Sequence, residues 1–200
     1  MSTSTLPPAS SDDNRLISRE PMFFVVSIKK LFIMTFFTLG LYSFYWSCRN
    51  WMFYRQATGE NVDPVWRSLL SVFSFYLLLS LVDRRIRSTG RQYAWSPALL
   101  SVGVMLAAAS PSVLLHISEH TYGRVPVSEV LVVLIPLGVM CFWIIGRAQQ
   151  AINYCEFDPV GRGNTELSMT ELVCALLGAL CWVALVMIGI LSMLLGIFDW

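Results

Sequence analysis

The chain has few charged residues for its length. Only 14% of its 200 residues are Asp, Glu, Lys or Arg, whereas an average soluble domain carries about 25%. Hydrophobic residues make up 56% of the sequence, and they form long runs instead of recurring with the period of an amphipathic helix or strand. A water-soluble surface cannot be assembled from this composition, so the runs predict helices that face lipid.

Several functional signatures are also missing. The formal net charge is +1 and the basic residues are scattered, which argues against a nucleic-acid partner. Five cysteines are an odd number and define no disulfide framework. The sequence contains no phosphate-binding glycine loop, nucleophile elbow or paired-cysteine metal motif.

The first 20 residues are rich in Ser, Pro and Asp. They lack the basic start and apolar stretch of a secretory signal. We expect a disordered cytoplasmic tail at 1–20, followed by a single transmembrane helical domain at 21–200.

Five apolar runs approach the length that crosses a bilayer, which is about 20 residues because the hydrocarbon core is roughly 30 Å thick. They occupy 31–48, 65–82, 93–117, 130–146 and 172–198. The run at 65–82 is the weakest, because its uncharged part is short, and a re-entrant or interfacial placement is the alternative for it. We predict an all-α polytopic bundle of about five spans.

The basic residues indicate an orientation, because Lys and Arg accumulate on the cytoplasmic side of a membrane. Arg84, Arg85, Arg87 and Arg91 form a short basic loop between the second and third predicted spans. This loop predicts a cytoplasmic N-terminus and an external C-terminus. If 65–82 does not span, the N-terminus moves to the outside and the charge bias weakens.

A distinctive pattern follows the tail. It begins with FFVVSIKKL at 23–31, continues with Met34, Thr38, Gly40, Leu41, Tyr42, Tyr45, Trp46, Asn50 and Trp51, and extends to Pro64, Trp66 and Arg67, with a weaker echo at 150–153. The pattern resembles a bacterial family of small multi-span inner-membrane proteins that carry a domain of unknown function, and it covers about half of the chain. Cys48 departs from it, since an aromatic residue is expected there. The resemblance implies a multi-pass protein of the bacterial inner membrane and brings no activity, substrate or catalytic residue.

Small and aromatic residues mark candidate contact surfaces. Thr38 with Gly40, and Cys174 with Gly178, are small enough to let a neighbouring helix approach closely. Aromatic side chains near predicted span ends are typical of the membrane interface, and these are Tyr42, Tyr45, Trp46, Trp51 and Trp66.

The most polar cytoplasmic stretch continues the fourth predicted helix beyond the membrane. It includes Gln149, Gln150 and Asn153. We interpret it as a candidate surface for a partner, with a plain solvated segment as the alternative.

His116, Glu119 and His120 match the H-x-x-E-H pattern of inverted zinc peptidases. Histidines four residues apart share a helical face and can bind one Zn²⁺ while the glutamate acts as base. A third ligand is required, and Glu129 is the only obvious nearby carboxylate. We interpret the match as fortuitous and predict no catalytic residue, metal site or cofactor.

The leading hypothesis is a non-enzymatic accessory protein of the inner membrane, whose partners are the lipid bilayer and another membrane protein or a second copy of itself. A small transporter or channel subunit is the alternative, because Pro97, Pro111 and Pro136 bend predicted spans. Against coupled transport, no ionisable residue lies in the middle of a predicted span. A membrane metallopeptidase is the remote third hypothesis.

Overall fold

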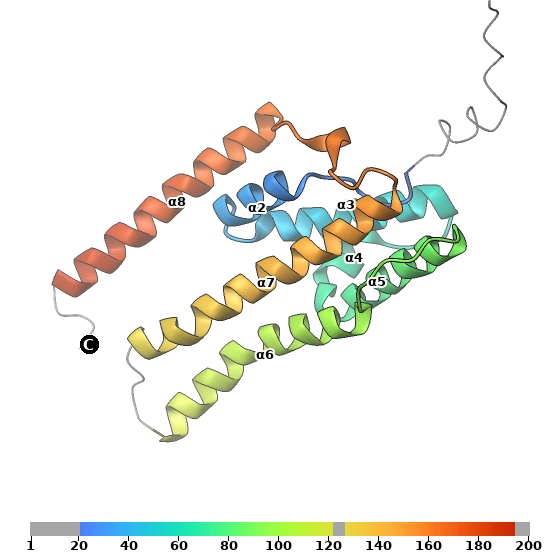
Figure 1. Cartoon of the computed structure of the whole chain (residues 1–200). Helices are drawn as coiled ribbons and strands as arrows, with labels where there is room; N and C mark the ends of the chain where they lie inside the picture. Colours follow the sequence, from blue (N-terminus) through green and yellow to red (C-terminus); the bar gives the residue numbers. More distant parts are fainter. Residues whose placement is uncertain (1–20, 122–126, 195–200) are drawn as a thin grey trace, which may run out of the picture.

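The regular structure of this chain is helical throughout the residues that the computed structural model describes, which are 21–121 and 127–194. The tail predicted at 1–20 lies outside them. The helices are α2 (Ile28–Phe37), α3 (Leu41–Thr58), α4 (Pro64–Leu69), α5 (Ser71–Ser88), α6 (Pro97–Thr121), α7 (Val127–Cys155), the short 3₁₀-helix η1 (Arg162–Asn164) and α8 (Met169–Leu194) (Figure 1). The predicted all-α class is confirmed.

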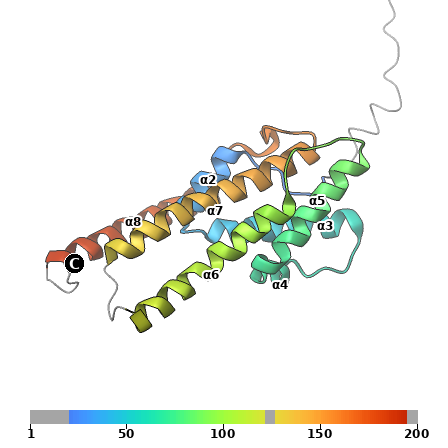
Figure 2. The same cartoon turned by 60° about the horizontal axis from the view of Figure 1, so that its bottom comes forward.

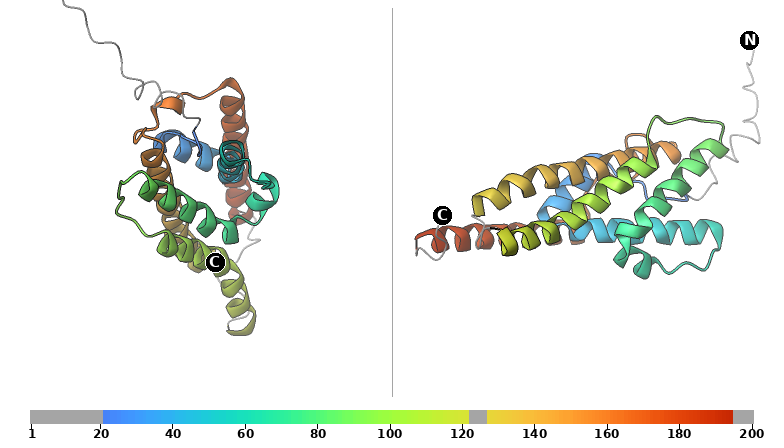
Figure 3. Two further views of the ribbon diagram at one scale, coloured as in Figure 1. Left: turned by 90° about the vertical axis from the view of Figure 1, so that its right-hand side faces the viewer. Right: turned by 90° about the horizontal axis from the view of Figure 1, so that it is seen from below.

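The molecule is elongated and has two ends of different character (Figure 3). One end, called the core end, contains α2 to α5 and the C-terminal half of α7 (Figure 1). The fully buried side chains gather there, among them Phe23, Trp51, Leu79, Ile86 and Ile152. The other end, called the apolar end, is formed by α6, α7 and α8 where they project beyond the core end (Figure 2).

Within residues 21–121 and 127–194, three helices are long and apolar enough to cross a membrane. The candidate spans are Pro97–Leu114 in α6, Val132–Cys155 in α7 and Met169–Ser192 in α8. Helices α6 and α7 run antiparallel beside each other, whereas the closest backbone neighbour of α8 in the described chain is α2 (Figure 1). The prediction of about five spans is therefore wrong.

The first predicted span, 31–48, is broken into two helices by a turn. Leu39 and Gly40 have φ values of 53° and 89°, in the left-handed region that ends an α-helix. Helix α2 has only 10 residues, or about 15 Å at 1.5 Å per residue. Helix α3 then runs back toward the core end (Figure 1) and carries Arg49, Asn50 and Arg55.

The second predicted span, 65–82, is broken at Leu70. Helix α4 begins where the Asp63 carboxylate accepts hydrogen bonds from the backbone N–H groups of Val65 and Trp66, with Pro64 at the first helical position. It ends after six residues. Helix α5 is amphipathic, and its second half carries Asp83 and a run of arginines, so neither helix has the uniform apolar surface of a span.

Candidate functional site

The N-terminal segment, residues 22–27, lies at the core end without regular secondary structure, and side chains of α3 and α7 hydrogen-bond to its backbone. Phe23, Phe24 and Val26 are buried in the core. A buried backbone segment outside helices and sheets needs hydrogen-bond partners, because an unpaired buried peptide group costs free energy. Side chains from the two flanking helices supply these partners.

Three fully buried amides hold the backbone of the segment. Asn50 Oδ1 accepts a bond from the Phe24 N–H at 3.1 Å, and Gln149 Nε2 donates to the Phe24 carbonyl at 3.0 Å. Asn153 Nδ2 donates to the Val26 carbonyl at 2.9 Å, and its Oδ1 accepts from the Val26 N–H at 3.4 Å. Helices α3 and α7 thus bind residues 22–27 much as a neighbouring strand would.

The amide side chains are also linked by hydrogen bonds, directly or through Trp46. Gln149 Nε2 donates to Asn153 Oδ1 at 2.6 Å, Trp46 Nε1 donates to Gln149 Oε1, and Asn50 Nδ2 donates to the Trp46 carbonyl at 2.9 Å. A fully connected buried network of this kind rigidifies its surroundings. Gln149 and Asn153, which the sequence marked as partner-contact candidates, contact this chain's own N-terminal segment, while the half-buried Gln150 accepts a bond from Arg147.

Lys30 forms a second polar centre where α2, the 156–168 linker and α8 meet. Its Nζ donates to Asn164 Oδ1 and to the Glu166 carbonyl, both at 2.6 Å, and pairs with Glu171 Oε2 at 2.8 Å. These three acceptors match the three protons of the ammonium group. Lys30 is buried, so the pair fixes the start of α8 against α2.

Glu171 has a further role at the start of α8. The Ser168 N–H donates to Glu171 Oε2 at 2.8 Å, and the Glu171 N–H donates to Ser168 Oγ at 3.3 Å. This reciprocal pair is a capping box. The sequence Ser-Met-Thr-Glu at 168–171, directly before an apolar run, is the signal that could have identified this capping box. No local sequence pattern indicates the ion pair between Glu171 and Lys30.

A groove of about 510 Å³ lies between α8 and the α2–α3 turn. We call it the α8 groove. Five residues singled out by the sequence line it together: Thr38, Tyr42, Tyr45, Cys174 and Gly178. Its remaining walls are mainly apolar, with Leu39 and Leu41 on one side and Leu177 on the other. The structure thus brings residues from two predicted packing faces to a single concave surface.

The two glycines of those faces have different roles. At Gly178 a Cβ atom would collide with the carbonyl group of Phe37, so this position permits the close approach of α2 to α8. At Gly40 no heavy atom of the described chain lies within 4 Å of a Cβ position, and its φ of 89° makes it a turn residue.

The aromatic residues expected at the membrane interface divide into two groups. Tyr42, Trp46 and Trp51 are buried within the core end, and the guanidinium group of Arg67 lies 4.5 Å from the ring centre of Trp51. Tyr45 and Trp66 are exposed. Of these five aromatic residues, only Tyr45 and Trp66 are therefore exposed enough to contact a membrane interface.

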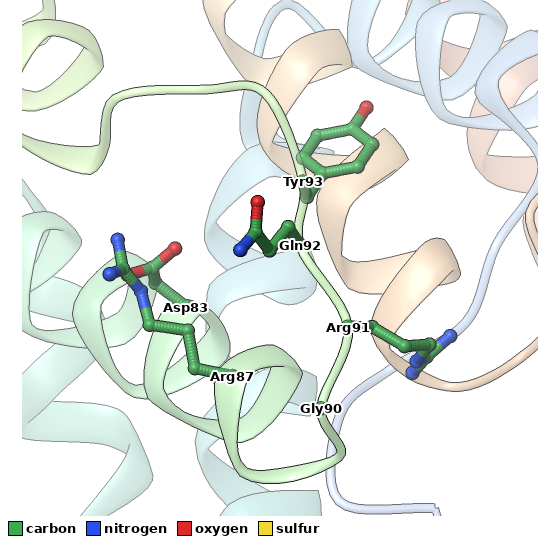
Figure 4. A pocket seen from close by; sticks show the side chains of 6 residues that line it. All are labelled: Asp83, Arg87, Gly90, Arg91, Gln92 and Tyr93. Atoms are coloured by element: carbon green, nitrogen blue, oxygen red, sulfur yellow. The ribbon is translucent and has the colours of Figure 1, made fainter.

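A polar pocket of about 470 Å³ lies at the end of α5, beside the 89–96 loop (Figure 4). Arg87 Nε pairs with Asp83 Oδ2 at 2.8 Å, and Trp95 Nε1 donates to Asp83 Oδ1 at 3.0 Å. The Arg91 side chain points away from these residues (Figure 4). It donates to the Tyr154 and Cys155 carbonyls at 2.8 and 2.9 Å and so caps the C-terminus of α7, where a cation is favoured.

Two carboxylates near the end of α7 have shifted pKa values. Burial raises the pKa of Glu156, and backbone N–H groups of Met22 and Phe23 and the nearby Arg85 and Arg91 oppose the shift only in part. For Asp158, partial burial is outweighed by three backbone N–H groups, at 161–163, and by the Arg162 charge, so its pKa is lowered. Glu156 Oε1 accepts the Phe23 N–H at 3.1 Å, which ties the linker to the N-terminal segment.

The zinc-peptidase pattern lies in the last turns of α6, where the backbone at 116–120 is helical. His116 is exposed, and the side chains of Glu119, His120 and Glu129 lie outside the described residues. Among the residues that are described, no group of three His, Cys, Asp or Glu side chains is placed to hold a metal ion.

Comparison of this chain with protein-family models, curated proteins and solved structures finds no match. The likeness of residues 23–67 to a bacterial membrane family stays a prediction.

Proposed function

We propose that this chain is an accessory protein of the bacterial inner membrane that crosses the bilayer three times and binds another membrane protein along α8, without catalysis. The observation that carries the proposal is the isolation of α8. Among the described helices, α2 is the one whose backbone packs closely against it, with contacts at Gly178 and Trp182, and side chains of α3 face it across the α8 groove.

The charge distribution supports three spans. In the described parts of the three candidate spans, Arg147 and Glu171 are the charged residues, and both lie toward the core end. Arg124 alone, of the 14 Lys and Arg residues in the sequence, falls between α6 and α7. With three spans, every basic residue outside the spans except Arg124 lies on one side of the membrane, which is a stronger charge bias than the five-span arrangement gives. The positive-inside rule then makes the core end cytoplasmic.

The free surface of α8 suits a partner helix. Its apolar side chains are largely exposed along its whole described length, with Leu180 at 65% and Ile188 at 61%. Lipid can solvate such side chains, but close helix association in membranes depends on small residues that let backbones approach. Gly189 is such a position, because no heavy atom of the described chain lies within 4 Å of its Cβ site.

Site-specific photo-crosslinking in membranes tests the proposal. A photoreactive residue at Ile188 on α8 is compared with one at Leu106 on α6, which is equally exposed to the surroundings. We expect a discrete crosslinked product from Ile188 only, and co-purification of the same species in a fixed ratio without crosslinking. A chain that purifies alone as a stable monomer, with similar diffuse products from both positions, contradicts the proposal.

A further inference from the structure

We infer that α2 and α3 form a re-entrant membrane hairpin. The hairpin enters the leaflet on the side of the core end, turns at Leu39 and Gly40 near the bilayer centre, and returns to the same side, with its tip against the acyl chains of that leaflet. The inference rests on the three-span proposal above, because α8 is taken as a span and serves as the measure of depth. It gives a place to the apolar run at 31–48, which does not cross the membrane in that arrangement.

The tip of the hairpin is apolar and exposed, and it points toward the apolar end of the molecule (Figure 1). Large exposed side chains surround the turn, and they include Phe36, Leu39, Leu41 and Phe44. No charged residue occurs between Lys30 on α2 and Arg49 on α3. Exposure of such a tip to water is unfavourable, whereas bilayer hydrocarbon solvates it.

Two contacts fix the depth of the hairpin against α8. A Cβ atom at Gly178 would collide with the Phe37 carbonyl. Trp182 Nε1 donates to the Phe36 carbonyl at 3.0 Å. Gly178 and Trp182 follow Glu171, in the first turn of α8, by seven and 11 residues, or about 10 and 16 Å at 1.5 Å per residue. Half of a hydrocarbon core roughly 30 Å thick is about 15 Å, so α2 ends near the bilayer centre.

Charged side chains mark the level at which both arms leave the hydrocarbon. Lys30 precedes Gly40 by 10 residues and Arg49 follows it by nine, so the two charges lie about 15 and 14 Å from the turn along their helices. Lys30 pairs with Glu171 at the start of α8 at 2.8 Å. The ends of the hairpin therefore coincide with the end of the proposed span, where charged residues are favoured over the bilayer interior.

The backbone of the turn is adapted to surroundings without water. The N–H groups of residues 38–41 and of Ser43 donate to backbone carbonyls of the hairpin at 2.8–3.1 Å. The Tyr42 N–H donates to Thr38 Oγ1 at 2.9 Å, and this hydroxyl donates to the Met34 carbonyl at 2.7 Å. The paired groups include the first three N–H groups of α3, which a helix start commonly leaves to water. Backbone polar groups within hydrocarbon must find their partners in the protein.

Spin labels in the full chain test the depth of the tip. The cysteine-free chain carries a label at Leu41→Cys, at Leu180→Cys or at Arg55→Cys, and is reconstituted alone into phosphatidylcholine vesicles. Leu180 is 65% exposed and lies nine residues beyond Glu171, about 14 Å into the proposed span. Arg55 is exposed on α3 beyond the charged level. Collisions are measured with O₂, which concentrates in hydrocarbon, and with a water-soluble nickel chelate.

We expect the labels at Leu41→Cys and Leu180→Cys to collide with O₂ and to be protected from the nickel chelate to a similar degree. The label at Arg55→Cys should show the reverse preference. Collision of the Leu41→Cys label with the nickel chelate overturns the inference, because the tip is then in water. Protection of that label from both reagents also overturns it, because protein then covers the tip.

The side of the Glu60 loop separates this inference from the three-span proposal. If a Leu41→Cys label is exposed to water while Glu60→Cys reacts from the cytoplasmic side, the hairpin is wrong and three spans remain. If the label lies in hydrocarbon while Glu60→Cys reacts from the external side, the 31–48 run crosses the membrane and both proposals fail.

A charge at the tip provides an independent test. Leu41→Arg places a cation at the bilayer centre, which is strongly unfavourable, whereas Met52→Arg makes a similar change at an exposed position of α3 beyond Arg49. We expect at least about five-fold less folded chain in the membrane for L41R than for M52R. Equal recovery of the two variants overturns the inference, since an arginine in water has no such cost.

Discussion

The carbonyl group of Phe37 occupies the space beside Gly178 in which a larger residue would place its Cβ atom. One turn further along α8, Trp182 Nε1 donates to the Phe36 carbonyl at 3.0 Å, and the two rings stack at 5.1 Å. The Phe36 carbonyl, which also accepts from the Leu39 N–H of the turn, thereby gains a hydrogen-bond partner from α8. This contact explains how a helix of 10 residues can end in an apolar setting.

Replacing Gly178 should separate α2 from α8. The Gly178→Leu variant forces α2 to move, because a side chain cannot coexist with the Phe37 carbonyl, and overpacking of this kind costs about 1–3 kcal/mol. We expect a lower Tm in detergent and a changed Trp182 fluorescence spectrum. Gly189→Leu is the matched control on the same helix, since no described atom crowds that position; equal losses in the two variants would contradict the contact.

The buried amide network should contribute strongly to stability. Asn153→Ala leaves both peptide groups of Val26 without their partner, and an unsatisfied buried group costs about 1–3 kcal/mol. We expect a clear fall in the free energy of unfolding measured in mixed detergent. Gln150→Ala, three residues away on α7, removes only the bond from Arg147 and should have a small effect.

Glu156 and Asp158 should respond to pH in opposite directions. The pKa of Glu156 is raised in the folded protein, so its contribution to stability is largest at low pH and falls as the pH rises through the folded value. Glu156→Gln should therefore raise the Tm relative to wild type at pH 8, and the gain should shrink toward pH 4.5, the ordinary value.

Asp158, in the same linker, should show the opposite dependence of stability on pH. Its pKa is lowered, so its contribution is present above its ordinary value of 3.8 and is lost as the pH falls through the folded one. Asp158→Asn should lower the Tm at pH 7, with the difference disappearing in acid. If the Tm differences from wild type of the two variants changed with pH in the same direction, the opposite pKa shifts of Glu156 and Asp158 would be contradicted.

Three spans and five spans place one loop on opposite sides of the membrane. Glu60 lies between α3 and α4, Thr89 follows α5, and Arg162 precedes α8. In a cysteine-free background, Glu60→Cys, Thr89→Cys and Arg162→Cys should all react from the cytoplasmic side with an impermeant maleimide. Labelling of Glu60→Cys from the opposite side would restore the five-span arrangement.

The sequence predicted the long helices better than the short ones. The runs at 93–117, 130–146 and 172–198 correspond to α6, α7 and α8, because a long uncharged stretch has few alternatives to a helix. The runs at 31–48 and 65–82 have similar hydropathy, yet the first is interrupted by left-handed residues at 39 and 40 and the second at Leu70. Averaged hydropathy does not register a change of backbone direction.

The sequence identified individual residues of the candidate site but not how they come together. Thr38, Tyr42, Cys174 and Gly178 were identified as contact residues, but their meeting in one groove depends on the turn at Gly40. Gln149 and Asn153 were identified as polar and unusual, and their bonds to Phe24 and Val26 join residues more than 120 positions apart. A single sequence has no signal for pairings at that separation.

The sequence alone determined that this chain is helical and suited to a membrane, because 56% hydrophobic residues in long runs cannot be covered by so few charges in water. The tertiary structure decided which runs are candidate spans, and it buried Lys30, Asn50 and Asn153 instead of exposing them. The reason is that polar groups next to apolar runs must find partners, and here those partners come from residues 22–27 and from the linker before α8.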